Sequence, residues 1–148
     1  MITKKSKYAI KALIFLAKKY QKGPILIGEI SEAERIPKKF LEAILLDLKK
    51  AGILGSKMGK GGGYYLLKTP EDVTLVDVYR LFDGAISLVS CVSLKFYERC
   101  EECEDEAICG IRDVFLDIRN ETLRIMKGST LQDLLQREIR LDQQRGAQ

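Results

Sequence analysis

The amino-acid sequence predicts a mainly α-helical fold with one small β-hairpin, and three observations lead to this expectation. Apolar residues recur every three or four positions in several separate segments, which is the spacing of one helix face. The glycine-rich run "GKGGG", residues 59–63, separates two short segments suited to β-strands. After Gly110 a further apolar stripe extends farther than so small a domain covers easily. These features predict a helical domain with a hairpin, followed by one long helix.

The first third of the chain predicts three helices. Apolar residues recur over residues 3–20 and form the first, which the sequence "KGP" then stops. A short helix is expected around residues 29–33. After the turn "RIP", a third, lysine-rich helix is expected over residues 37–51, with Pro37 suited to its first position. Gly52 is predicted to end this helix in a left-handed conformation, so that two helices are joined by a tight turn.

The hairpin follows these helices directly. Strands are expected at residues 53–58 and 64–68, on either side of a tip where glycines allow almost any backbone angle. The order helix, short helix, turn, lysine-rich helix and hairpin is that of a winged helix-turn-helix, a DNA-binding fold. The glycine run is not a phosphate-binding P-loop, because the spacing G-x-x-x-x-G-K-[ST] is absent.

The second half of the chain predicts three more helices. A capping-box pattern formed by Thr74 and Asp77 begins a helix that reaches residue 82. The long helix is expected to follow Gly110 and to end at Gly128. Ser129 and Gln132 are then expected to cap a last short helix, "TLQDLL", and the polar tail after it is expected to be disordered.

The composition is typical of one soluble globular domain. The 148 residues include 46% apolar and 31% charged residues. No apolar run approaches the roughly 18 residues that span a bilayer, so no membrane segment is expected. The N-terminus resembles a signal peptide only superficially, because lysines interrupt it and no small-residue cleavage site follows. We therefore expect a cytoplasmic protein, in which clustered cysteines favour metal or redox roles over structural disulfides.

The charge is divided unevenly between the two halves. Residues 1–70 carry 15 lysines and arginines against 5 acidic residues, whereas residues 71–148 carry 10 against 16. A basic half of this kind favours binding to a polyanion such as double-stranded DNA. Phe40 is ambiguous, because it suits either the core or a thymine methyl group. The candidate DNA-contacting residues lie at the start of the first helix, at the start of the lysine-rich helix and on the hairpin: Lys4, Lys5, Ser6, Lys7, Lys38, Lys39, Phe40, Glu42, Lys57, Lys60, Gly61 and Gly62.

Every cysteine of the chain lies in one stretch, "CVSLKFYERCEECEDEAIC", residues 91–109. Four interpretations are open. Four thiolates suit an iron–sulfur cluster. They also suit a structural zinc ion, although the C-x₂-C pair expected twice occurs once. Cys100 and Cys103 are close enough in sequence for thiol–disulfide exchange. The fourth interpretation is that the cysteines only fill space.

Five segments of the sequence resemble one family of bacterial regulators. The matching segments are "KYAIKAL", "IPKKFLEAILLDLKKAGIL", "SKMGKGGGYYL", "TPEDVTLVDVYRLFDG" and "IRDVFLDIRNETLRIMKGSTLQDLL". They are similar to the Rrf-type winged-helix transcriptional regulators, which include an iron–sulfur cluster regulator, a nitric-oxide-sensitive repressor and a cysteine-metabolism repressor. The resemblance implies a winged helix-turn-helix plus a long dimerisation helix, in a homodimer that reads a pseudo-palindromic operator. The division that follows is a DNA-binding domain at 1–84, a cysteine-containing sensory loop at 85–110, a dimerisation helix with a short terminal helix at 111–137, and a disordered tail at 138–148.

The same resemblance implies a ligand set for the cysteines. In cluster-binding members three cysteines in this place hold the cluster, and a histidine or an N-terminal acidic residue is the fourth ligand. This chain has no histidine, and Lys7 and Tyr8 occupy the N-terminal position. Its spacing, C-x₈-C-x₂-C-x₅-C, also departs from the even spacing of those members. A [2Fe-2S] or [4Fe-4S] cluster would therefore be held by Cys91, Cys100, Cys103 and Cys109, and an apo preparation would lack it.

The sequence gives less support to other classes of function. An enzyme is not expected, because the chain has no histidine, no nucleophile–base constellation and no nucleotide fingerprint. A redox electron carrier is the remaining alternative among cluster proteins. We expect a homodimeric DNA-binding transcriptional regulator whose operator affinity is modulated by a cysteine-ligated iron–sulfur cluster. The alternatives for the same regulator are thiol–disulfide chemistry and a structural Cys₄ zinc ion.

Overall fold

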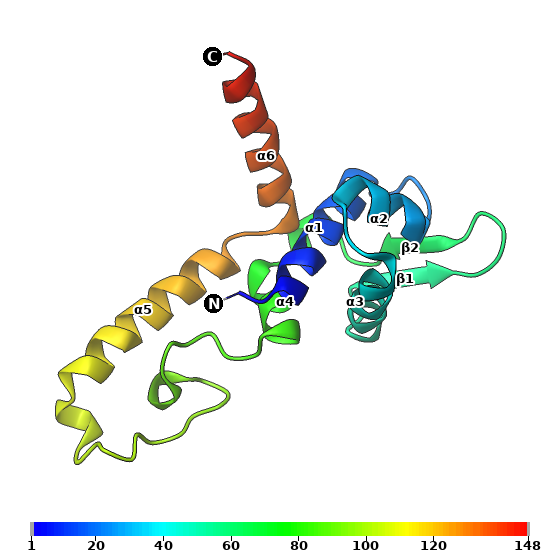
Figure 1. Ribbon diagram of the computed structural model, residues 1–148. Helices are drawn as coiled ribbons and strands as arrows, with labels where there is room; N and C mark the ends of the chain where they lie inside the picture. The colour runs from blue at the N-terminus through cyan, green and yellow to red at the C-terminus, as the bar shows by residue number, and fades with distance from the viewer. Residues whose placement is uncertain (1, 148) are drawn as a thin grey trace.

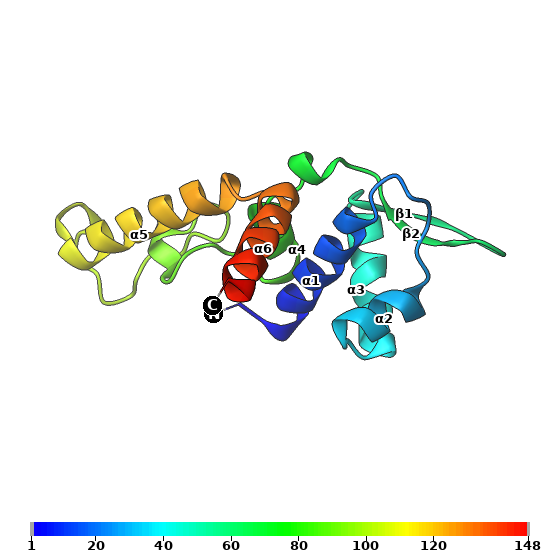
Figure 2. The same ribbon diagram turned by 90° about the horizontal axis from the view of Figure 1, so that it is seen from above.

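The computed structural model describes residues 2–147 as an elongated, mainly helical molecule (Figure 1). The first three helices and the hairpin lie at one end, and a long helix with its preceding loop extends to the other (Figure 2). The helices and strands are α1 (Lys4–Lys18), α2 (Ile27–Glu34), α3 (Lys38–Lys50), β1 (Leu54–Lys57), β2 (Gly63–Leu66), η1 (Pro70–Asp72), α4 (Leu75–Phe82), η2 (Ser90–Val92), η3 (Glu106–Ile108), α5 (Gly110–Lys127) and α6 (Leu131–Gly146).

The core forms around α1, which packs against α2, α3, α4 and α6. Its inward face is a row of buried alanine and leucine side chains, and small residues let the neighbouring helices approach closely. In α3, the spacing predicted from the sequence places four side chains inward with none of their surface exposed: Leu41, Ile44, Leu45 and Leu48. Burying a side chain of this size stabilises the fold by about 1.5–3 kcal/mol. These residues therefore fix α3 on α1 and leave its polar face outside.

A tight turn sets the angle between α2 and α3. Arg35 ends α2 with a φ of 54°, in the left-handed region, and Ile36 behind it is buried. Pro37 lies one residue before α3 rather than at its first position, and Gly52 follows the helix with a φ of 76°. The predicted left-handed residue after the helix is therefore confirmed.

The hairpin pairs Leu54 with Leu66 and Lys57 with Gly63. A third segment joins it, because the backbones of Ile25 and Tyr64 exchange two hydrogen bonds of 2.8 Å. Nothing in the local sequence predicts this bridge. Gly63 is required there: its φ is 142°, and a Cβ atom would lie 2.2 Å from the carbonyl oxygen of Ile25. The bridge thus holds the hairpin to the loop after α1.

The C-terminal region corrects two predictions. The capping residues are Thr130 and Asp133, which form a complete capping box, and not Ser129 and Gln132. The helix also continues to Gly146, so the prediction of a disordered tail from residue 138 is wrong. The segment after residue 135 contains good helix formers and neither glycine nor proline before Gly146, which explains the continuation. An ion pair of 2.9 Å between Lys18 and Glu138 ties this extension to α1.

The capping box of α4, formed by Thr74 and Asp77, is present as predicted. Gly84 follows this helix with a φ of 84° and begins the loop that carries the cysteines. Across residues 2–147 we find no helix with the length and apolar character needed to cross a membrane.

Candidate nucleic-acid interface and cysteine site

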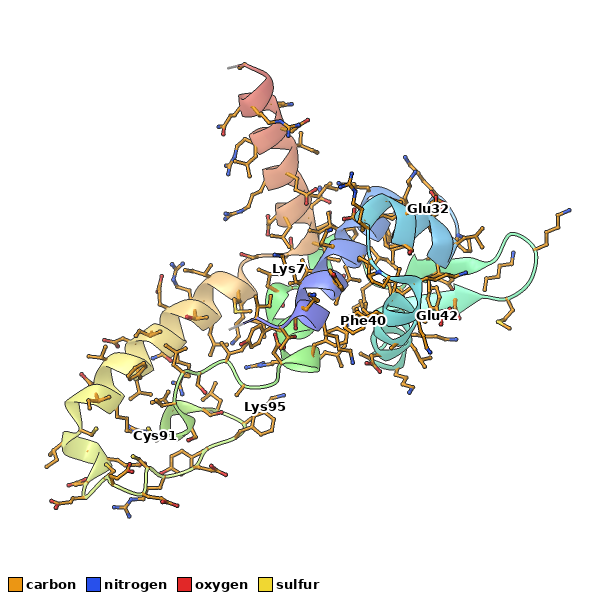
Figure 3. The ribbon with its side chains drawn as sticks, in the orientation of Figure 1. Lys7, Glu32, Phe40, Glu42, Cys91 and Lys95 are labelled. Atoms are coloured by element: carbon orange, nitrogen blue, oxygen red, sulfur yellow. The ribbon has the colours of Figure 1, made fainter. Side chains whose placement is uncertain are left out.

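The N-terminal turn of α3 presents an exposed polar surface. Lys38, Lys39 and Glu42 are all exposed there, since the apolar stripe of the helix faces inward. Phe40 is 41% exposed, and its ring packs edge-on against Tyr8 of α1 at a centroid distance of 5.7 Å. Figure 3 shows Phe40 and Glu42 on α3, with Lys7 on the neighbouring α1. Phe40 therefore divides its surface between the contact with α1 and the solvent.

The four residues at the start of α1 that were predicted to contact DNA differ in their exposure to solvent. Lys4 and Lys7 are exposed. Lys5 is half-buried, and its Nζ atom lies 2.8 Å from Oδ2 of Asp47 and 5.2 Å from the ring centroid of Phe82. Ser6 is fully buried. A hydroxyl contact from Ser6 to DNA has no support in this arrangement, because the side chain faces the core.

The hairpin extends away from the helices and carries Lys57 and Lys60, both exposed (Figure 1). At its tip, Gly61 is exposed with a φ of 73°. The Gly62 amide already donates to the carbonyl of Gly59 at 3.0 Å, so it is not free to bind a phosphate. The hairpin therefore offers two ammonium groups and the Gly61 backbone, but not Gly62, to an anion.

The cysteine segment is anchored to α5 at both ends. Cys109 is the N-cap of α5, and its sulfur accepts a hydrogen bond from the backbone N–H of Arg112 at 3.4 Å. Cys91 lies in η2, where the carbonyl of the next residue, Val92, accepts a hydrogen bond of 2.6 Å from the Arg119 guanidinium of α5. Figure 3 shows Cys91 beside α5. Both ends of the loop thus contact α5 directly.

A turn holds the middle of the segment. The N–H of Cys103 donates to the carbonyl of Cys100 at 3.2 Å. Arg99 donates to the carbonyls of Cys103 and Glu104 at 3.1 and 2.9 Å. Farther along, the Tyr97 hydroxyl donates to Glu106 at 2.7 Å, which raises the pKa of Tyr97 above its usual value. The loop therefore has internal order, although it contains only short helical turns.

All four cysteines are free thiols and line one cavity of about 250 Å³. The partial burial of Cys103 and the nearby thiols of Cys109 and Cys100 raise its pKa above the usual value. The thiol of Cys103 is thus close enough to those of Cys109 and Cys100 to be affected by them. The lining residues are Val89, Ser90, Cys91, Cys100, Cys103, Glu106, Cys109, Ile111 and Arg112.

The arrangement of the thiols bears on what the cavity can hold. Within residues 2–147 no three histidine, cysteine, aspartate or glutamate side chains are placed to hold one metal ion. Tetrahedral zinc needs sulfur atoms about 2.3 Å from the metal and hence about 3.8 Å from each other. A cluster of several iron and sulfide atoms keeps its ligands farther apart and uses the same four thiolates. The four thiols that line the cavity are thus the donor set that a cluster uses, although the residues described are not placed to hold a single metal ion.

Two residues without a predicted role join this site. Arg112 lines the cavity, and Arg119 holds the turn of Cys91. The position of Arg112, three residues after Cys109 and so one helical turn away, was a signal in the sequence. No such signal existed for Arg119, because its partner is a backbone carbonyl 27 residues earlier.

Comparison with known proteins gives consistent similarities along almost the whole chain. Residues 2–137 match the Rrf2 family, described as an iron-dependent transcriptional regulator. An Rrf2-like HTH-type transcriptional regulator of Rhodobacter capsulatus is 44% identical over 138 residues, which cover 91% of this chain and 92% of the relative. The HTH-type transcriptional regulator CymR of Bacillus subtilis is 31% identical over 90% of this chain and 88% of its own length.

Solved structures agree with the fold. The structure of B. subtilis CymR, described as the global cysteine regulator of that organism, superposes with a TM-score of 0.77 and 30% identity, over 92% of this chain and 96% of CymR. The T. potens IscR structure has a TM-score of 0.72 and 22% identity over 93% of this chain and 88% of its own, which supports the fold alone. The predicted fold class, mainly helical with a hairpin wing, is confirmed.

Proposed function

The chain belongs to the Rrf2 family of transcriptional regulators, and from this premise we propose that it senses its signal through an iron–sulfur cluster held by its four cysteines. It is a transcriptional regulator and not an enzyme, as the relatives' names indicate. One observation carries the proposal: Cys91, Cys100, Cys103 and Cys109 all line a single cavity. We place its action in the cytoplasm.

Regulators of this family bind DNA and act as dimers. In the proposed complex, the N-terminal turn of α3 enters the major groove, and Lys38, Lys39 and Glu42 face the base edges and phosphates. Lys57 and Lys60 on the wing neutralise phosphate charge. Lys4 and Lys7, at the start of α1, neutralise further phosphate charge. Four of the twelve residues predicted to contact DNA are therefore exposed lysines outside α3.

The exposed face of α5 supports a homodimer. Ile111, Val114, Ile118 and Ile125 are 70%, 56%, 40% and 51% exposed, and their spacing places them along one side of the helix. A stripe of this kind on a long helix marks an interaction surface. Two copies related by a two-fold axis cover it mutually, and such a dimer reads a pseudo-palindromic operator.

The cysteine loop connects the sensory cavity to the DNA-binding surface. When bound, an iron–sulfur cluster would supply a redox-active centre that cross-links the four thiolates. The protein's own groups transmit the state of the loop: Cys109 caps α5, and Arg119 joins the turn of Cys91 to the same helix. A change in the loop therefore shifts α5, and in a dimer that alters the spacing between the two α3 helices. Half-sites lie about 34–36 Å apart, so a small change in spacing lowers affinity.

A thiol switch without metal is the second candidate. Cys103 lies near the thiols of Cys109 and Cys100, which would allow a disulfide to form in an oxidised state. Among the structural relatives, CymR of Staphylococcus aureus has been solved in an oxidised form. A thiol switch uses two cysteines, whereas the cluster uses all four.

Anaerobic purification followed by a visible absorption spectrum and an assay of iron, sulfide and zinc tests the proposal. The cluster hypothesis predicts a coloured protein that contains both iron and acid-labile sulfide. A colourless, iron-free protein under these conditions would contradict it. Zinc in place of iron would support the Cys₄ zinc site, and the absence of any metal would support the thiol switch.

A further inference from the structure

Arg112 has a buried polar atom for which the fold provides no partner. It lies in the first turn of α5, where its backbone N–H donates to the Cys109 sulfur. Its side-chain Nε is buried and makes no hydrogen bond with any of the residues described. Leaving a buried donor unpaired costs about 1–3 kcal/mol, and more for a charged group, so such a donor requires an explanation.

The residues around the Arg112 guanidinium indicate that its partner is an anion in the cysteine cavity. Among the residues described, Arg112 is the only cationic one that lines the cysteine cavity, and the lining also includes four cysteines and Glu106. The nearest alternative in the loop, Arg99, already donates to two backbone carbonyls. The whole segment 91–109 carries six acidic residues against two basic ones. An anionic occupant of this cavity would therefore depend on Arg112 for positive charge.

We propose that Arg112 is a positioning residue of the cysteine site, whose guanidinium faces the sulfur atoms of the cavity and stabilises the anionic, occupied state. This inference rests on the proposed function. Four thiolates around a cluster core of charge +2 give a net charge of −2, and one electron from a reductant makes it −3. A fixed cation favours the more negative state, and N–H···S hydrogen bonds act in the same direction, so both raise the reduction potential.

The test compares three variants after anaerobic reconstitution with iron and sulfide. In Arg112→Gln the positive charge is lost, in Arg112→Lys it is kept, and in Arg124→Gln the same loss occurs on the exposed side of α5, where Arg124 pairs with Glu121. The midpoint potential of each is measured by titration with dithionite, a one-electron reductant. Circular dichroism checks that the helices are intact.

In Arg112→Gln we expect the equilibrium to shift about tenfold towards the oxidised form, which corresponds to a midpoint about 59 mV more negative. Arg112→Lys and Arg124→Gln should keep the wild-type potential. Loss of iron from Arg112→Gln, with retention in Arg112→Lys, would also support the inference.

Three results would overturn it and identify which idea has failed. If the wild type holds a cluster but Arg112→Gln keeps its potential and iron content, the role of Arg112 is wrong and the proposed function stands. The role of Arg112 is equally wrong if Arg112→Lys behaves like Arg112→Gln. If the wild type binds no iron, the proposed function and the inference both fail.

Discussion

At the scale of single residues, a carboxylate joins the start of α1 to the end of α4. Asp83 accepts hydrogen bonds from the backbone N–H and the hydroxyl of Thr3, at 3.2 and 2.5 Å. The partial burial of Asp83 would raise its pKa, but these hydrogen bonds outweigh burial and lower it from the ordinary 3.8. Asp83 directly precedes Gly84, where the cysteine loop begins. The contact therefore links the start of the cysteine-containing loop to α1.

The lowered pKa of Asp83 predicts how its contact depends on pH. A carboxyl whose pKa is lower in the folded state stabilises the fold above the unfolded pKa and loses this effect as pH falls through the folded value. Asp83→Asn should therefore be less stable than wild type at pH 7, by less than about 1 kcal/mol because the site is solvated. The gap should close as the pH falls through the folded pKa of Asp83, which lies below 3.8. Thermal unfolding across this range measures it, and a gap that does not change with pH would contradict the account.

Cys91 distinguishes the two sensing mechanisms. It lies farthest along the chain from the other three cysteines, yet it lines the same cavity. If all four thiolates hold a cluster, Cys91→Ser should lose most of its bound iron after anaerobic reconstitution. The neighbouring Ser90→Ala, which changes the cavity lining without removing a thiol, is the matched control. Equal iron in the wild type, Cys91→Ser and Ser90→Ala would show that Cys91 is not a ligand.

At the scale of elements, the wing is the part whose contribution to DNA binding is easiest to isolate. Lys57 and Lys60 are exposed, and neither supports the hydrophobic core. Replacing both with alanine should weaken binding to every duplex sequence and reduce the magnitude of the salt dependence by about two ions. Gel-shift titrations at several salt concentrations measure this slope.

The matched control for the wing is Lys127→Ala, at the end of α5 and far along the chain from the hairpin. It should leave the slope unchanged. A double wing variant with the wild-type slope would show that the hairpin does not contact phosphates.

The N-cap of α6 gives a prediction about stability. The Thr130 hydroxyl accepts a hydrogen bond from the Asp133 backbone N–H at 3.1 Å, and its own N–H donates to the Asp133 carboxylate at 2.9 Å. Thr130→Ala should lower the free energy of unfolding by about 0.5–2 kcal/mol. Thr130→Ser keeps the hydroxyl and should cost less. Denaturant unfolding compares the two, and equal stability of the alanine variant and the wild type would contradict the assigned cap.

Elements with strong local signals could be predicted from the sequence, and those determined by distant contacts could not. The capping box of α4 and the left-handed Gly52 depend on neighbours in the chain, and both were predicted correctly. The bridge between Ile25 and Tyr64 joins segments 39 residues apart and has no local pattern. The extension of α6 was missed because its polar composition resembles a free tail, whereas Lys18 of α1 pairs with it.

The same distinction applies to the candidate site. Cysteines are recognisable by residue type and clustering, so the sequence identified all four. Arg112 could have been noticed from its spacing of three residues after Cys109. Arg119 is an ordinary surface residue in sequence, and only the conformation of the loop places it against the Val92 carbonyl. Conversely, Ser6 and Gly62 were predicted to contact DNA, but one faces the core and the other uses its amide within the turn.

At the scale of the whole molecule, the exposed stripe on α5 predicts an assembly. Val114 and Ile118 are 56% and 40% exposed and lie four residues apart on one helix face. A double change of these residues to glutamate should convert the dimer to a monomer, because burying two carboxylates in an apolar interface is costly. Light scattering coupled to gel filtration measures the mass. Leu26→Glu, a change at a leucine that is 62% exposed and lies outside α5, should remain dimeric, and a dimeric double variant would place the interface elsewhere.

In the proposed mechanism, the state of the cysteine loop controls the spacing of the two α3 helices in the dimer. The most direct test is an anaerobic titration of one DNA duplex, selected from a random pool by the protein itself, with the cluster-loaded protein and with the same protein after chelation. Allosteric coupling of ordinary strength predicts affinities that differ by about 5- to 150-fold. Cys91→Ser should give the affinity of the chelated protein under both treatments. Equal affinities of the loaded and chelated wild type would contradict the account.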